Sequence, residues 1–287
     1  MAETKPTAPT RNITSVQPRK SGNVISLIAP FACILIGYII WRYLLGGASN
    51  FTNPDPDASH WFWPNHKGPK GTLTKMYEGG IVVPVLIGCF LIVITFVIER
   101  FLTISRAKGN GSIEEFIRKV QFHLSNKDLD KAIVECDKQR GSVGNVMKAG
   151  LRKYKEMIGN VELDTDQKVL NIQKEVEEAT ALELPMLEKN LVFLSTMASV
   201  ATLLGLFGTV LGMIKSFSAL GDEGGANAAS ELSKGISEAL YNTALGIGTS
   251  ALAIIFYNMF TTKIDAITYG IDESGFTLTQ SFAANYK

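Results

Sequence analysis

Residues 191–220 read LVFLSTMASVATLLGLFGTVLGMIKSFSAL, and this stretch decides the fold of the chain. The hydrocarbon core of a bilayer is about 30 Å thick, so an α-helix crosses it with roughly 20 apolar residues. The stretch exceeds that length and carries one charged residue, Lys215, near its end. It predicts a membrane-spanning helix that tilts or protrudes from the bilayer.

Two stripes of side chains run along this predicted helix at steps of three and four residues. One stripe bears hydroxyls at Ser195, Ser199, Thr202, Thr209 and Ser216, interrupted by Leu206 and Met213. The other consists of small residues, namely Ala198, Ala201, Gly205, Gly208 and Gly212. Small residues let a second helix backbone approach closely, and Gly208 and Gly212 have the spacing typical of such contacts. The small stripe is therefore assigned to helix packing.

The same length rule predicts three further spans, at residues 24–46, 79–98 and 235–260. The last of these repeats the pattern, with one face formed by Ala239, Thr243, Gly246, Ser250 and Ala253. Its Glu238 is explained either by the helix dipole or by a place on an ion route. Asn258 is costly in lipid unless paired, so we expect it to face protein or a wet vestibule.

The aligned hydroxyls allow two interpretations. Ser and Thr can bond back to their own helix, so they are tolerated in a membrane protein that serves only as a scaffold. Hydroxyls aligned over several turns of two consecutive spans instead favour the lining of a narrow path for protons or small cations.

Charged residues predict how the spans are oriented. Basic residues precede the first span and follow the second, at Arg11, Arg19, Lys20, Arg100, Arg106 and Lys108, so both of these flanks are expected to be cytoplasmic. The predicted cytoplasmic parts are a tail over 1–23, a helical domain over 99–190 and a tail over 261–287. The predicted periplasmic loops are 47–78, where Trp61 and Trp63 would anchor at the headgroups, and 221–234. The first span is expected to be an uncleaved anchor; the alternative is a signal peptide, with a mature N-terminus near Ser49.

Residues 99–190 hold 16 basic and 16 acidic side chains, which marks this segment as the water-exposed domain. Ser112 and Glu115 predict a capping box ahead of an amphipathic helix, and further helices are expected from Asp128 and Ser142. A pattern beginning at Asp164 runs on toward the third span. It predicts one long helix that crosses into the membrane with a kink near Pro185. The fold class expected is therefore an all-α membrane protein with four transmembrane helices and long helices that extend into a helical cytoplasmic domain.

Several functional classes are disfavoured by composition. The net charge of +1 and the absence of single-signed charge runs argue against a nucleic-acid partner. Neither a metal site nor a cofactor is expected, because Cys33, Cys89, Cys136, His60, His66 and His123 lie apart from one another. No nucleotide-binding, zinc-protease or nucleophile-elbow motif is present in the sequence, so an enzyme is not expected.

Two longer motifs resemble those of the ExbB and TolQ proteins in the MotA/TolQ/ExbB proton channel family. Residues 205–212 read GLFGTVLG, similar to G-L-F-G-T-V-x-G, and residues 236–246 read ISEALYNTALG, similar to I-x-E-A-L-x-x-T-A-x-G. The resemblance extends over residues 79–263 and includes the Tyr257-Asn258 pair. The chain departs from the usual ExbB plan in its extra span at 24–46 and in the longer loop that follows.

The resemblance implies a subunit of a bacterial inner-membrane motor driven by the proton motive force. It implies a homo-oligomer, a pentameric ring, around an ExbD-like single-span partner that carries a membrane aspartate. Thr209 and Thr243 match the threonines that face this aspartate, while Glu238 and Asn258 match further polar positions of the ion route. In ExbB systems the motion is passed to a TonB-like protein for active transport across the outer membrane. A TolQ-like role in envelope maintenance, a gliding motor and a MotA-like stator stay open, as do the choice between H⁺ and Na⁺ and the transported cargo.

Overall fold

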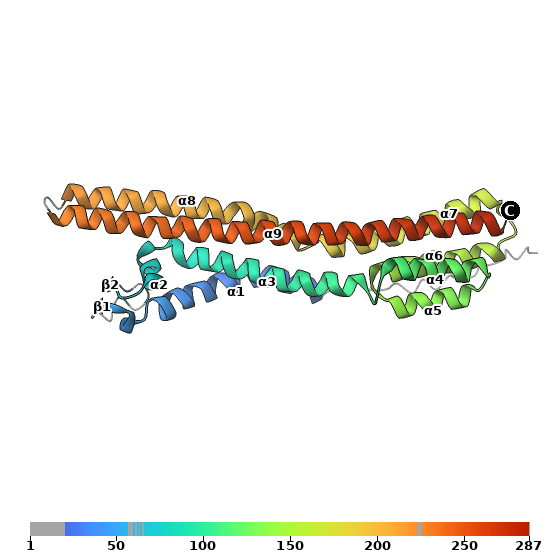
Figure 1. Cartoon of the computed structure of the whole chain (residues 1–287), viewed down its shortest axis with the longest axis horizontal. Helices are drawn as coiled ribbons and strands as arrows, with labels where there is room; N and C mark the ends of the chain where they lie inside the picture. Colours follow the sequence, from blue (N-terminus) through green and yellow to red (C-terminus); the bar gives the residue numbers. More distant parts are fainter. Residues whose placement is uncertain are drawn as a thin grey trace, which may run out of the picture.

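The computed structural model describes residues 21–56, 60, 62, 64, 66–222 and 226–286. The molecule is elongated, and its last helix runs along nearly its whole length (Figure 1). The anchoring role predicted for Trp61 and Trp63 falls outside the described residues, as does most of the predicted tail at 1–23.

Helices form almost all of the described structure. In chain order the main ones are α1 (Ser21–Ile39), α2 (Thr72–Lys75), α3 (Val82–Lys108), α4 (Ile113–Ser125), α5 (Leu129–Gln139), α6 (Gly141–Gly159), α7 (Thr165–Glu188), α8 (Leu191–Asp222) and α9 (Ala226–Asn285). Short helical turns are η1 (Ile40–Leu45), which extends α1 as a π-helix, and the 3₁₀ turns η2 (Ala48–Asn50) and η4 (Met76–Gly79). A two-stranded antiparallel ribbon joins β1 (Phe51–Asn53) to β2 (Lys67–Pro69).

Four helical segments are long and apolar enough to cross a membrane, as the sequence predicts. They are Leu27–Leu45, Val82–Ser125, Thr165–Ser218 and Leu232–Asn285. The chain is thus an all-α membrane protein with one small ribbon. The ribbon was not predicted because strands of three residues are too short to show alternation.

The extra first helix packs directly against α3. A methyl carbon added to Gly37 of α1 would lie 2.6 Å from the backbone nitrogen of Gly88, and one added to Gly88 would lie 2.8 Å from Ile34 Cα. Only glycine permits such an approach of two helix backbones. Beyond this crossing, Trp41 in η1 is buried against Tyr77, with the two ring centroids 4.4 Å apart and the rings stacked.

The segment predicted to be a water-exposed domain forms a helical bundle of α4 to α7 with the second half of α9, and these helices lie together at one end of the molecule (Figure 1). Here the structure differs from the predicted C-terminal tail at 261–287, because this segment continues α9 as a helix. Its apolar side is buried at Ile264, Ile267, Ile271, Leu278 and Phe282. The Phe282 ring, for example, meets the Tyr154 ring of α6 edge-on at 4.8 Å. The segment is therefore part of the domain core.

The helices of this domain begin close to the predicted positions, but one of the predicted N-terminal caps is not formed. Asp164 accepts a hydrogen bond from the backbone nitrogen of Gln167 at 2.8 Å. Helix α4 begins after Ser112, but the Ser112 side chain makes no capping bond, and Glu115 pairs instead with Lys119 at 2.7 Å. The predicted capping box is therefore not formed, because the glutamate is drawn to the lysine one turn further along.

The predicted long helix through residue 190 is divided in two. Helix α7 ends at Glu188, and α8 begins at Leu191 after a two-residue turn. Proline removes one backbone donor from a helix, and Pro185 lies in the last turn of α7. The carbonyl oxygens there are capped from α3, since Arg100 Nη1 donates to Leu187 O at 2.8 Å.

Arg100 makes the polar contacts that connect α3 to this junction. Its side chain is 3% exposed and pairs with Glu99, which in turn accepts a hydrogen bond from Asn190 in the turn at 3.1 Å. The two adjacent residues at the end of the second predicted span thus hold α3 against the α7–α8 turn.

Replacing Arg100 is expected to destabilise this junction. A hydrogen bond to a charged group contributes about 1.5–3 kcal/mol, so Arg100→Met should lower the free energy of unfolding by roughly 2–3 kcal/mol. Thermal unfolding of the purified full chain in detergent measures this loss. The matched control is Arg118→Met on the exposed face of α4, and equal melting temperatures for the two variants would contradict the role assigned to Arg100.

Candidate ion path between helices α8 and α9

Helices α8 and α9 form an antiparallel pair in close backbone contact, as Figure 1 shows. A methyl carbon added to Gly246 would lie 2.5 Å from Ala201 O and 2.9 Å from Gly205 Cα. One added to Gly208 would lie 2.8 Å from Asn242 Cβ, and one added to Gly212 would lie 2.7 Å from Ala239 Cβ. The structure thus places all four glycines assigned to packing at this contact.

The close contact brings Thr209 and Thr243 together. Their hydroxyl oxygens contact each other, and each hydroxyl also donates to Gly205 O at 3.1 Å. A hydroxyl has one hydrogen and two lone pairs. When the hydrogens point at Gly205 O, the remaining lone pairs can accept a hydrogen bond from an incoming donor.

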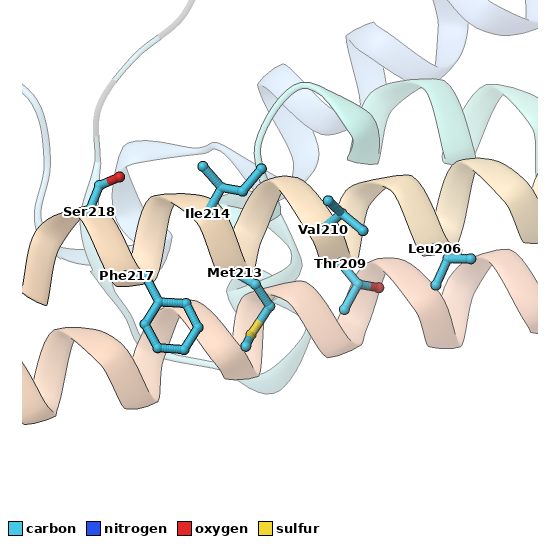
Figure 2. Close-up of a pocket in the computed structure, with 7 residues that line it drawn as sticks. All are labelled: Leu206, Thr209, Val210, Met213, Ile214, Phe217 and Ser218. Carbon is cyan, nitrogen blue, oxygen red and sulfur yellow. The ribbon is translucent and has the colours of Figure 1, made fainter.

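Thr209 also lines a groove on the outer side of α8. Figure 2 shows the lining side chains, all from α8, which are Leu206, Thr209, Val210, Met213, Ile214, Phe217 and Ser218. Five of the seven are apolar, and Leu206, Ile214 and Phe217 are each more than half exposed. The threonine pair therefore sits at the edge of an apolar face that the chain itself leaves uncovered.

The other hydroxyls of α8 and α9 bond either to their own helix or across to the neighbouring helix. Ser195, Ser216 and Thr249 donate back to carbonyls of their own helix, as tolerated polar residues do. Ser250 instead donates across to Ala198 O of α8. Of the described hydroxyls in α8 and α9, only Thr209 and Thr243 are joined to each other.

The remaining predicted path residues lie apart from the threonines. Asn258 is exposed on α9, 15 residues and therefore about 22 Å along the helix from Thr243. Glu238 is half-buried and five residues from Thr243, which puts it on a different face of the helix. The chain alone does not unite these four residues in one site.

Two residues that the sequence analysis did not assign to the ion path lie near Glu238, beside the first half of α9. Glu78, in η4, lies within hydrogen-bonding reach of the Glu238 side chain. Asn242 is 2% exposed and donates to Gly79 O at 3.0 Å. An amide inside an apolar span was a usable signal for Asn242, whereas nothing local could link Glu78 with a residue 160 positions later.

Comparison with known proteins gives the same family as the motifs. The profile of the MotA/TolQ/ExbB proton channel family matches residues 138–273. The TolQ protein of the Tol-Pal system from Haemophilus influenzae is 30% identical over 202 residues, which cover 67% of this chain and 85% of that protein. The chain belongs to the MotA/TolQ/ExbB family. It is accordingly a multi-pass membrane protein of the transport type.

Other members of the MotA/TolQ/ExbB family align over shorter stretches. TolQ from Pseudomonas aeruginosa is 31% identical over 125 residues, covering 44% of this chain and 54% of that protein. A putative biopolymer transport protein, ExbB-like 3 from Synechocystis, is 42% identical over 87 residues, covering 30% of this chain and 41% of that protein. The alignments with these two relatives thus span about half of each relative's length, and the relatives carry both ExbB and TolQ names.

The helix contact is expected to tolerate no side chain at Gly246. Gly246→Val forces atoms into the backbone of α8, and overpacking of this kind costs about 1–3 kcal/mol. The control is Gly248→Val on the same helix, since a methyl carbon there meets no atom within 4 Å. Thermal unfolding in detergent should show a lower melting temperature for Gly246→Val alone, and the contact is refuted if the two variants melt together.

Proposed function

We propose that this chain is the channel-forming subunit of an ExbB-type motor in the bacterial inner membrane. In this proposal the flow of protons down the proton motive force energises a TonB-like protein for active transport across the outer membrane. The observation that carries it is the Thr209–Thr243 hydroxyl pair beside an uncovered groove of α8. Such a pair can exchange hydrogen bonds with a carboxyl group presented by another helix.

The uncovered apolar face of α8 supports assembly with other helices. Lipid could cover the apolar side chains, but it offers no hydrogen-bond donor to the remaining lone pairs of the two hydroxyls at the edge of the groove. A single-span, ExbD-like partner with a membrane aspartate fits both needs, because its apolar face covers Leu206 and Phe217 while its carboxyl reaches Thr209. A homo-pentamer around this partner is the assembly that the family resemblance implies.

The second candidate is a TolQ-like role in envelope maintenance. It is favoured by the TolQ alignment that covers 85% of the relative, the longest of the three described above. Both roles use the same path through the membrane. They differ in the protein that receives the motion, so co-purification with a TonB-like or a Tol-type partner separates them.

The path is tested by removing the hydroxyls without changing the side-chain shape. Thr209→Val and Thr243→Val should abolish uptake of a large substrate under an imposed proton gradient when the chain is co-expressed with an ExbD-like partner. The matched control is Thr261→Val, because the Thr261 hydroxyl bonds only to Tyr257 O of its own helix at 3.0 Å in the described structure. Membrane levels of all variants are measured alongside.

Normal uptake by both path variants would contradict the ion path and favour a structural scaffold. A scaffold would tolerate the loss of these hydroxyls but would be disrupted by Gly208→Leu, because a side chain at Gly208 meets Asn242. Loss of uptake at normal membrane levels in the two path variants, but not in Thr261→Val, would support the motor.

A further inference from the structure

Two carboxyl groups from distant parts of the chain meet beside the first half of α9. Glu78 belongs to the short η4 turn ahead of α3, and Glu238 lies on α9; their side chains lie within hydrogen-bonding reach of each other. Two ionised carboxylates have no hydrogen to share, so they can form a hydrogen bond with each other only when one of them carries a proton. Pairs of this kind hold one proton between them because two adjacent negative charges repel.

The surroundings of Glu78 act in opposite directions on its proton affinity. Burial is the largest influence and raises the pKa of Glu78, whereas hydrogen bonds from Glu238 and from the backbone of Gly68 lower it. The charges of Lys234 and Lys215 also lower it. The net pKa is raised. A carboxyl group held in this way is closer to gaining and losing a proton at neutral pH than an exposed glutamate.

The turn that carries Glu78 is held in place by its neighbours. Tyr77, the preceding residue, is buried, and its hydroxyl donates to Pro64 O at 2.6 Å. Trp41 Nε1, at the end of the first helix, donates to Tyr77 O at 3.3 Å. The backbone of Gly68, in β2, lies close enough to the Glu78 side chain to lower its pKa. The first helix and the ribbon thus fix the position of this carboxyl.

Asn242 provides a second and independent observation at the same place. It lies one turn from Glu238 along α9, and its Oδ1 sits against Gly79, next to Glu78. This oxygen is buried and accepts no hydrogen bond from any residue that the structure describes. Leaving a buried acceptor unpaired destabilises a protein, so the position of this oxygen points to a hydrogen-bond donor that enters the site.

We propose that Glu78 and Glu238 form one proton-binding site of the ion path, and that Asn242 Oδ1 accepts a hydrogen bond from the water or hydronium that carries the proton onward. The inference rests on the proposed function and deepens it by naming the carboxyl groups that bind the proton. Proton uptake changes the charge of the pair from −2 to −1. The same proton then leaves the pair toward Thr209 and Thr243, so only O–H bonds form and break.

The experiment is infrared spectroscopy of the purified full chain in liposomes during a pH titration. The carbonyl stretching band of the pair's protonated carboxyl should persist above the pH at which exposed glutamates lose theirs, and it should disappear as the pH is raised through the pKa of the pair. Glu78→Gln and Glu238→Gln should each remove this band. The control Glu162→Gln, at an exposed position of the α6–α7 loop, should retain it.

Transport provides the second measurement, in the same assay as the threonine variants. Glu78→Gln should lose proton-driven uptake or shift its pH profile, while its melting temperature stays near that of the unaltered chain. If Glu78→Gln fails to fold, Glu238→Gln examines the same pair from the other helix.

The possible outcomes are distinguishable from failure of the proposed function. Absence of the band in the unaltered chain, or its persistence in both glutamine variants, overturns the proton-binding pair even if Thr209→Val abolishes uptake. A band that titrates as expected, together with normal uptake and an unchanged pH profile in Glu78→Gln, places the pair outside the route. Normal uptake in Thr209→Val and Thr243→Val counts against the motor itself.

Discussion

The close backbone contact between α8 and α9 is the constraint on which the rest of the structure depends. Gly205 and Gly246 leave no room for a side chain between the two helices. Lipid is as apolar as the side chains it would replace, so membrane helices associate through close packing and polar contacts. Here one contact supplies both, because the carbonyl oxygen of Gly205 accepts bonds from the two threonines that the packing brings together.

The same contact separates two chemical environments along α9. On the side toward α8 and the groove, Thr243 meets Thr209 next to an uncovered apolar surface. On the side toward the start of α3, Asn242 and Glu238 meet Gly79 and Glu78. Little more than one turn of α9 therefore separates the carboxyl pair at Glu238 from the hydroxyl pair at Thr243. Between them lies the Asn242 amide, which packs against Gly208.

The parts in which the chain departs from the usual ExbB plan acquire a structural role in this arrangement. The first helix crosses α3 at Gly37 and Gly88, and its end packs Trp41 on Tyr77. At the opposite end of α3, Arg100 caps the end of α7. The segment from η4 to α3 is thus held at two places, at Tyr77 by an aromatic contact and at Arg100 by a buried charge.

The sequence by itself determined the helices and the family, and its motifs singled out Thr209 and Thr243. Long apolar stretches can satisfy their backbone in lipid only as helices, and the small and hydroxyl stripes are periodic, so both are readable along the chain. Tertiary structure alone decided that residues 261–285 belong to the domain core, that the helix breaks after Glu188, and that Glu78 meets Glu238. These features depend on contacts between residues far apart in the sequence, and such contacts leave no local period or motif.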